Sequence, residues 1–161
     1  MKKYLFLLFI IGLSLNACSE DKDMYQIADE NISIYSPRKD KLFKKLESDM
    51  YNLAPATGEV NADRSNYRFN AARTDEELKG QYGACEFKVN FKEKKAYPSS
   101  KSRGEIARAY LYMNKKYGIQ LSKTQLKLYQ SWNKMYPVSD WEKLRAKRIS
   151  KLQKNKKSFI Q

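Results

Sequence analysis

The residues of this chain that could take part in chemistry gather between positions 52 and 68. Asn52 ends a charged segment, and Arg64 and Arg68 follow in a stretch rich in turn-forming residues. An amide oxygen is a suitable ligand for a hard divalent cation, and guanidinium groups bind phosphate. This combination predicts a metal and phosphate site. The usual proton acceptor at such a site is histidine, and the sequence contains none.

Each of these residues also has a purely structural interpretation. Asn52 could end a helix, because asparagine tolerates the left-handed conformation at a helix C-terminus; from the residues alone this cap is the favoured interpretation. Arg64 and Arg68 could belong to a solvated loop that is closed by its own Asn and Asp side chains. For the two arginines the sequence supports a phosphate contact and a loop role equally.

A second concentration of charge lies near the C-terminus. Eight cations stand there against Asp140 and Glu142: Lys143, Arg145, Lys147, Arg148, Lys151, Lys154, Lys156 and Lys157. Such a run is often only a solvated helix face, but this excess of positive charge goes beyond what solubility requires. We expect Lys147, Arg148 and Lys151 to attract phosphates, with an affinity that falls steeply as salt rises.

The first residues indicate export. Two lysines, the apolar run YLFLLFIIGLSL and the segment NACS follow in the order of a signal peptide covering residues 1–17, and the run is too short for a membrane span. LNAC resembles the lipobox of bacterial lipoproteins, which predicts acylation of Cys18; the alternative is an ordinary residue just beyond a cleavage site. Residues 18–37 would be a tether and residues 38–161 the folded domain.

Composition and cysteine usage narrow the possible partners. The 161 residues, a length typical of one domain, carry a formal net charge of +14, so we expect attraction to nucleic acid, anionic lipid or anionic glycan. With Cys18 acylated, Cys85 would be a single leftover thiol in an oxidising compartment, either buried and unpaired or in an intermolecular disulfide. The unpaired thiol is the favoured interpretation. The lack of a CxxC pair argues against structural zinc.

Apolar periodicity predicts the elements that must position these residues. Residues 38–53 should form one helix, because their apolar side chains recur three and four residues apart. The side chains on this face are Leu42, Phe43, Leu46, Met50 and Leu53. Residues 58–70 are expected to be a loop. The alternation in ACEFKVNFKEKKAY, residues 84–97, predicts a half-buried strand.

Three helices are predicted after this strand. Ser102 is suited to cap the first, which would end at a left-handed Gly118. Capping boxes, Ser-x-x-Gln from residue 122 and Ser-x-x-Glu from residue 139, open the second and third. The helical spacing of the aromatic residues favours a core over base-stacking platforms. The expected core residues are Tyr110, Tyr112, Leu126, Tyr129, Trp132, Trp141, Leu144 and Ile149.

Five blocks of the sequence together resemble the bacterial endonuclease I family, secreted or periplasmic metal-dependent nucleases that cut DNA without sequence preference. In order they are SDMYNLAPATGEVNADRSNYRF, YGACEFKVNFKEKKAYP, RGEIARAYLYMNKKYG, LSKTQLKLYQSWNKMYPVSDWEKLRAKRI and LQKNKKSFI. The resemblance covers roughly residues 38–160. It implies an α+β, mainly helical fold with a ββα-metal nuclease core and a C-terminal helical cluster. It also implies that Asn52 is a ligand of one divalent cation, usually Mg²⁺.

The sequence departs from the family pattern in a way that bears on catalysis. The family carries a Glu-His block upstream of the asparagine, and no comparable block precedes SDMYNL. We therefore assign no catalytic residue, expect Mg²⁺ to be held weakly or lost, and expect an N-terminally shortened remnant of the family fold. The tail LQKNKKSFI also lacks the Gly and Pro of the family's usual ending.

Three functions follow as expectations. The first is an endonuclease that hydrolyses phosphodiester bonds of DNA, with RNA as a further substrate, and that is impaired by the loss of the Glu-His block. The second is a catalytically inactive, nucleic-acid-binding remnant. The third is a lipid-anchored basic envelope protein whose partner is anionic glycan or lipid. We expect a monomer that is periplasmic, anchored to the outer membrane through Cys18, or secreted.

Overall fold

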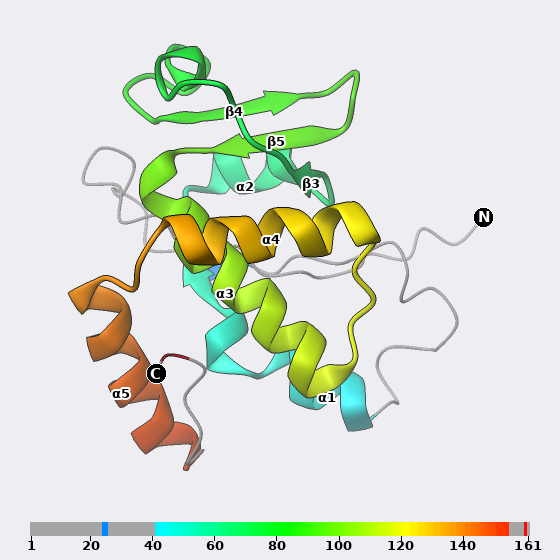
Figure 1. Ribbon diagram of the computed structural model, residues 1–161, viewed down its shortest axis with the longest axis vertical. Helices are drawn as coiled ribbons and strands as arrows, with labels where there is room; N and C mark the ends of the chain where they lie inside the picture. The colour runs from blue at the N-terminus through cyan, green and yellow to red at the C-terminus, as the bar shows by residue number, and fades with distance from the viewer. Residues whose placement is uncertain (1–23, 26–40, 155–159, 161) are drawn as a thin grey trace.

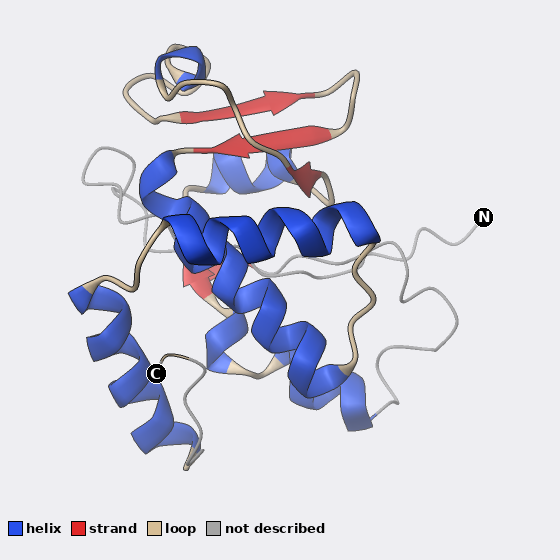
Figure 2. Ribbon diagram, viewed as in Figure 1, coloured by secondary structure: helices blue, strands red, loops and turns tan. Residues whose placement is uncertain are grey.

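Helices make up most of the structure, a computed structural model that describes residues 24–25, 41–154 and 160 (Figures 1 and 2). The α-helices in this part of the chain are α1 (Lys41–Glu47), α2 (Gly58–Arg64), α3 (Ser100–Tyr117), α4 (Lys123–Met135) and α5 (Asp140–Gln153). Two 3-10 helices accompany them, η1 (Met50–Asn52) and η2 (Glu76–Leu78). The predicted mainly helical α+β class is confirmed, and the ββα-metal core stays a prediction. No helix in the described ranges is both long and apolar enough to cross a membrane.

The strands form one small sheet and one short pair. Strands β3 (Arg68–Phe69), β5 (Lys95–Pro98) and β4 (Phe87–Asn90) lie in that order, with β5 antiparallel to β4 and parallel to β3. β1 (Met24–Tyr25) pairs with β2 (Ala54–Pro55), although its residues fall in the predicted tether. The rest of that tether and the predicted signal peptide lie outside the described residues. Figure 1 shows the sheet at one end, α3 and α4 crossing beneath it, and α5 to one side.

One core fills the space between the inner face of the sheet and helices α2, α3 and α4. Its buried residues are Ala54, Val60, Phe69, Phe87, Val89, Ala96, Ile106, Ala107, Tyr129 and Trp132. The rings of Tyr110 and Tyr129 stack here with centroids 4.7 Å apart. The prediction that these aromatic residues pack in a core is therefore confirmed.

A second core fastens α5 and η1 to α1 and α3. Its buried residues are Leu46, Tyr51, Tyr112, Met113, Ile119, Ala146 and Ile149. Beside it, Arg108 of α3 donates two hydrogen bonds, of 2.7 and 2.6 Å, to the buried carboxylate of Glu142 in α5. A Cβ atom at Gly104 would lie 2.7 Å from the carbonyl oxygen of Tyr136, so only glycine allows α3 to approach that segment.

Several helix boundaries follow from local hydrogen bonding. Both predicted capping boxes are present, and Gly118 ends α3 at a φ of 72°. Ser102 is not the cap of α3, because the helix begins earlier and Ser102 is buried inside it. The first helical N–H, that of Ser100, instead donates to the carboxylate of Asp75 at 3.0 Å. A residue far outside the helix therefore supplies the cap.

Three predicted segments differ from the structure. The helix expected over 38–53 ends at Glu47, where Ser48 donates to a carbonyl of the last turn, and Leu42 is 52% exposed. Residues 58–64 form α2 instead of a loop, because burial of Val60 outweighs the local turn preferences. Residues 84–97 form the β4–β5 hairpin rather than one strand, and Phe91 in its turn is exposed.

Two further expectations about buried residues are wrong. Trp141 and Leu144 are 47% and 42% exposed, because α5 turns Ala146 and Ile149, on another face, toward the core. Cys85 is buried but is not a free thiol, since the structure records it as disulfide-bonded. Cys18 lies outside the described residues.

Candidate metal and nucleic-acid site

The predicted ligand Asn52 lies at the end of a buried 3-10 turn. Its main-chain N–H donates to the carbonyl of Asp49 at 2.8 Å, and its side-chain amide nitrogen donates to the carbonyl of Leu46 at 3.3 Å. Leu46 belongs to the last turn of α1, and its carbonyl also accepts the main-chain N–H of Asp49 at 3.3 Å, so the amide is a second donor to this carbonyl. The cap interpretation is wrong, because Asn52 lies within η1, whose C-cap is Leu53, and does not have a positive φ.

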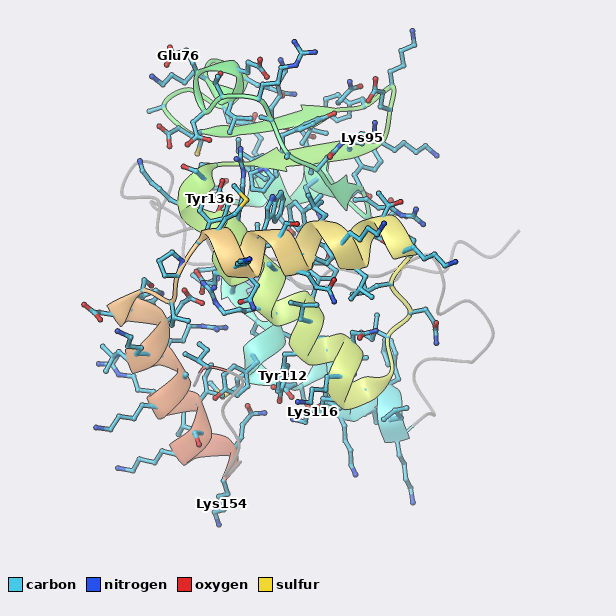
Figure 3. The ribbon with its side chains drawn as sticks, viewed as in Figure 1. Glu76, Lys95, Tyr112, Lys116, Tyr136 and Lys154 are labelled. Atoms are coloured by element: carbon cyan, nitrogen blue, oxygen red, sulfur yellow. The ribbon has the colours of Figure 1, made fainter. Side chains whose placement is uncertain are left out.

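Asp49 organises this turn from within. Its side chain is fully buried and accepts the N–H of Tyr51 at 3.0 Å, Lys116 Nζ at 2.6 Å, and the hydroxyls of Tyr117 and Tyr112 at 2.7 and 2.8 Å. Burial alone would raise the pKa of Asp49, but these hydrogen bonds outweigh it and hold the pKa below its ordinary value. Figure 3 shows Tyr112 and Lys116 near each other on α3. The turn is therefore anchored to α3 by a charged residue.

Arg145 anchors the same turn to α5. Its guanidinium donates to the main-chain carbonyls of Met50, at 2.9 Å, and of Leu53. The hydroxyl of Tyr51 donates in the opposite direction, to the carbonyl of Ala146 at 3.1 Å. Arg145 belongs to the run of cations near the C-terminus, and the structure turns it inward. The turn that carries Asn52 and the cationic helix α5 are consequently fastened together.

A small cavity of about 20 Å³ lies beneath the turn. Tyr51, Glu105, Arg108, Glu142 and Arg145 are among its lining residues. Burial raises the pKa of Glu105 to about 7, with the charge of Arg145 opposing that rise. A carboxyl group with this pKa could accept a proton at neutral pH. The cavity has room for about one water molecule and none for a phosphodiester, so Glu105 is not placed to act on substrate.

The two arginines of the predicted phosphate loop have different environments. Arg64 is 1% exposed, lies 4.4 Å from the centroid of the Phe69 ring and donates to the hydroxyl of Tyr110 at 2.9 Å. A phosphate contact by Arg64 is at odds with this burial, because the guanidinium is enclosed by its own core. Arg68 is exposed on β3 and remains a candidate for binding phosphate.

Helix α5 presents the remaining cations. Lys147, Lys151 and Lys154 are exposed and recur four and seven residues apart, which places them on one face, and Arg148 is exposed beside them. Figure 3 shows Lys154 at the end of α5, pointing away from the rest of the protein. Lys143 is partly neutralised by Asp140, at 2.9 Å. Lys156 and Lys157 lie outside the described residues. The exposed set therefore includes the three α5 cations that were expected to attract phosphates, Lys147, Arg148 and Lys151.

The described residues do not by themselves form a complete magnesium site. Mg²⁺ usually binds one or two carboxylates together with water and substrate oxygens. Within residues 24–25, 41–154 and 160, no group of three or more His, Cys, Asp or Glu side chains is arranged to hold a metal ion. The nearest acidic residue along the chain, Asp49, is fully buried and already accepts four hydrogen bonds. Asn52 could contribute one oxygen ligand at most.

Comparison with known proteins identifies the family. The fold is α+β, and the cationic helix α5 is attached to the buried turn that carries Asn52. These features are those of a basic protein suited to a polyanionic partner. The profile of the endonuclease I family matches residues 26–161, and the chain belongs to this family. It is 48% identical over 120 residues to a periplasmic deoxyribonuclease of Aeromonas hydrophila, covering 74% of this chain and 49% of that protein.

Other relatives give the same result. The chain is 44% identical over 121 residues to endonuclease-1 of Buchnera aphidicola subsp. Acyrthosiphon pisum (strain APS), covering 75% of this chain and 47% of that protein. It is 49% identical over 71 residues to an extracellular endonuclease of Pseudomonas fluorescens biotype A, which is 44% of this chain and 31% of the relative. The chain spans about half the length, or less, of the curated relatives that it matches.

Proposed function

We propose that this chain acts on nucleic acid as a member of the metal-dependent, non-specific endonucleases. Its substrate would be the phosphodiester bonds of DNA, with RNA as a further substrate. Family membership and the deoxyribonuclease and endonuclease names of its relatives support this proposal. Since the chain spans about half of those relatives, it carries part of the activity: Asn52 as one oxygen ligand of Mg²⁺ and α5 as the surface that holds phosphates.

The observation that carries the proposal is the attachment of α5 to the Asn52 turn. Arg145 and Tyr51 together make three hydrogen bonds between the two segments. Lys147, Arg148 and Lys151 extend from the same helix into solvent. A duplex held by these cations would therefore have a fixed position relative to Asn52, which is the kind of positioning that phosphoryl transfer requires.

Catalysis by this chain alone is expected to be weak. The sequence contains no histidine, and a general base is typically worth ~10²–10⁴ in rate. Magnesium bound through Asn52 would stabilise charge on the scissile phosphate, but it needs carboxylate ligands that the described residues do not offer. The role of this chain's own residues is to bind and orient the duplex. An inactive nucleic-acid-binding protein is the second candidate, and the absence of histidine from the sequence favours it.

Plasmid nicking tests both candidates. We expect the purified chain to bind supercoiled plasmid and slow its migration in a gel, and to nick it at most feebly with Mg²⁺. The Asn52→Ala variant should show nearly the same trace of nicking activity. Asn66→Ala, an exposed asparagine, is the control. Rapid nicking that Asn52→Ala abolishes would mean that another residue replaces the histidine and that the chain is an active enzyme. Failure to bind plasmid at low salt would leave anionic lipid or glycan as the partner.

The location proposed for the chain is outside the cytoplasm. Two relatives are named as periplasmic and extracellular deoxyribonucleases of Aeromonas hydrophila, and the first residues have the pattern of a signal peptide. Acylation of Cys18 would add an anchor to the envelope. We expect a monomer, since the proposed DNA surface does not require a second copy.

A further inference from the structure

The outer face of the β3–β5–β4 sheet is unlike its inner face. Phe87, Val89 and Ala96 point into the core. The residues that alternate with them along β4 and β5 therefore point outward, and these are Lys88, Asn90, Lys95 and Tyr97. The strand register pairs Lys88 with Tyr97, and Asn90 with Lys95. It also pairs Lys95 with Arg68. Directly opposite residues lie about 5 Å apart on one face of a sheet, so this face presents one aromatic ring among three cations.

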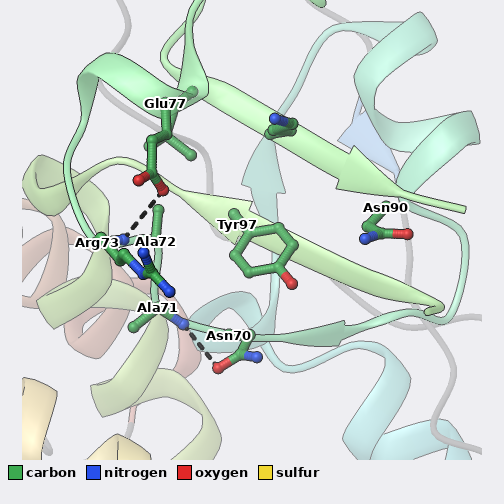
Figure 4. Close-up of a pocket in the computed structure, with 9 residues that line it drawn as sticks. Asn70, Ala71, Ala72, Arg73, Glu77, Asn90 and Tyr97 are labelled. Atoms are coloured by element: carbon green, nitrogen blue, oxygen red, sulfur yellow. Dashed lines mark hydrogen bonds between the residues drawn. The ribbon is translucent and has the colours of Figure 1, made fainter. Parts of the chain in front are cut away.

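A groove of about 320 Å³ lies over part of this face. The chain that follows β3 forms one wall, and its lining includes Asn70, Arg73, Glu77, Lys88, Asn90 and Tyr97. Figure 4 shows the ring of Tyr97 in the middle, between the side chains of Asn70 and Asn90, with Arg73 and Glu77 toward the end away from Asn90. This volume is at the lower end of the range for small-molecule sites. It suits one nucleotide and is far too small for a duplex.

Internal hydrogen bonds fix the direction of several groove side chains. The Oδ1 atom of Asn70 accepts the N–H of Ala71 at 2.9 Å, and Oδ1 of Asn90 accepts the N–H of Glu93 at 3.0 Å. Each asparagine thus uses its acceptor locally, and among the described residues neither side-chain nitrogen has a hydrogen-bond partner. The pKa of Glu93 is lowered, first by Lys95 and also by the hydroxyl of Tyr97. Tyr97 lines the groove between these two asparagines.

The charges of the groove are available to a ligand. Within the described ranges, neither Arg73 nor Lys88 has a carboxylate within ion-pair distance, and both are exposed. Glu77 accepts the main-chain N–H of Arg73 at 3.3 Å. Its carboxylate would repel a phosphate placed next to it and would accept a hydrogen bond from an amino group on a base edge. The groove therefore combines phosphate-binding cations, amide donors, one acceptor and an aromatic surface.

We propose that this groove binds an unpaired nucleotide of single-stranded nucleic acid, with the base stacked on Tyr97 and its phosphates near Arg68, Arg73 and Lys88. The inference rests on the proposed function only in taking nucleic acid as the partner. Stacking on an aromatic side chain together with a cationic groove is the general mode of single-strand binding. Paired bases are excluded because a duplex keeps their faces inside its own stack. The groove is a second contact, on the sheet, whereas α5 serves the duplex.

Fluorescence anisotropy with labelled oligonucleotides of about 15 nucleotides, a length within reach of a single-strand site, tests this proposal. The DNA and RNA forms are compared with a duplex of the same length. We expect Tyr97→Ala to weaken single-strand binding about tenfold, Tyr97→Phe to bind like the natural chain, and duplex affinity to be unchanged by either. Lys88→Ala should weaken single-strand binding more than Lys127→Ala, a matched loss of charge from exposed α4. Circular dichroism verifies folding.

Each outcome supports or overturns the assignment. A loss specific to Tyr97→Ala on either DNA or RNA supports it, and the stronger of the two names the preferred strand. The assignment is overturned if Tyr97→Ala binds single strands as tightly as the natural chain, or if it loses as much affinity for the duplex as for the single strand. Competition by inorganic phosphate as effective as that by a mononucleotide would also overturn it, since the ring would then be unused. If α5 variants lose duplex binding while Tyr97 variants change nothing, this inference fails and the proposed function stands. If Tyr97→Ala loses single-strand binding while α5 variants keep duplex binding, the groove is supported and the proposed role of α5 in duplex binding is wrong.

Discussion

The guanidinium of Arg145 donates a 2.9 Å hydrogen bond to the main-chain carbonyl of Met50, although the two residues are 95 positions apart. The same guanidinium reaches the carbonyl of Leu53. These two carbonyls bracket the turn that carries Asn52, and the Met50 carbonyl also accepts the main-chain N–H of Leu53 at 3.3 Å. One residue in the C-terminal helix therefore completes the hydrogen bonding of the candidate ligand turn.

Replacement of Arg145 should lower stability. Hydrogen bonds from a charged donor to carbonyls in a partly buried site are worth ~1.5–3 kcal/mol, so Arg145→Ala should reduce the free energy of unfolding by ~2 kcal/mol. Urea denaturation followed by circular dichroism measures this quantity. Lys147→Ala, two positions along the same helix and exposed, is the control and should change it by less than ~0.5 kcal/mol. Equal effects of the two substitutions would mean that the Arg145 contacts contribute nothing.

Glu105 should make stability fall as pH rises. Its pKa is raised from 4.5 to about 7 in the folded protein, so the folded state holds a proton that the unfolded chain releases. Stability is lost as pH rises from the unfolded pKa through the folded pKa. Glu105→Gln removes this loss and should stabilise the protein at about pH 8, but not at about pH 4, by up to ~3 kcal/mol.

Urea denaturation at both pH values measures this difference for Glu105→Gln. Glu76→Gln is the control, because the exposed pair of Glu76 with Lys79 contributes little to stability at either pH. A Glu105→Gln variant with the same pH dependence as the natural chain would show that this carboxyl titrates normally.

Duplex binding should depend on α5 and on salt. Replacing Lys147, Arg148 and Lys151 by Ala should lower the slope of log affinity against log salt by ~0.9 per lost phosphate contact, and lower affinity at least tenfold near ~0.1 M salt. The matched control replaces Lys123, Lys127 and Lys134, exposed on α4, and removes the same charge. Titration of a labelled duplex at several salt concentrations gives both quantities. Parallel losses in the two triple variants would show that only net charge matters.

Arg64 and Arg68 should separate stability from binding. Arg64→Ala removes the hydrogen bond to the Tyr110 hydroxyl and the cation–π contact with the Phe69 ring, and we expect a loss of ~2–3 kcal/mol in unfolding free energy. Arg68→Ala, on the exposed side of β3, should change stability by less than ~0.5 kcal/mol while weakening single-strand binding. Thermal unfolding and anisotropy distinguish the two. A stable Arg64→Ala protein with weakened binding would reverse this assignment.

Cys18 and Cys85 lead to a prediction about modification. The sequence has these two cysteines only, and Cys85 is disulfide-bonded in the structure. A sulfur that carries a lipid cannot also form a disulfide, so acylated Cys18 and an intrachain bridge exclude each other. Intact mass after thiol alkylation, with and without reductant, distinguishes them. Metabolic labelling with a fatty acid should mark the acylated form, and an unlabelled protein whose two thiols react only after reduction would rule out the anchor.

The sequence predicts those parts of the fold in which the signal is local. The capping boxes at Ser122 and Ser139 and the left-handed Gly118 depend on neighbouring residues and were predicted correctly. The segment at 58–64 has the composition of a loop, yet it forms α2 because Val60 and Arg64 are buried. Tertiary packing of this kind overrides local preference. It depends on contacts between distant residues, which the pattern of a single sequence does not reveal.

The candidate site shows the same division. Residue type and family resemblance indicate Asn52 and the exposed cations of α5 as candidate site residues, and their roles stay predictions. Asp49, Glu105 and Arg145 were not indicated in this way, because their roles depend on partners dozens of residues away. The one available signal was the position of Asp49 directly before the turn, where Asp is a favoured cap. Tyr97 gave no signal in sequence, since its neighbours in the groove come from three separate segments.

The long-range clamp by Arg145 also has a consequence for biosynthesis. The residues around Asn52 are synthesised before those of α5. The hydrogen bonds from Arg145 to the carbonyls of Met50 and Leu53 can form only after α5 has been synthesised. During synthesis or translocation the candidate ligand turn therefore lacks these hydrogen bonds until α5 has emerged. The candidate site is therefore complete only after α5 has packed against the Asn52 turn.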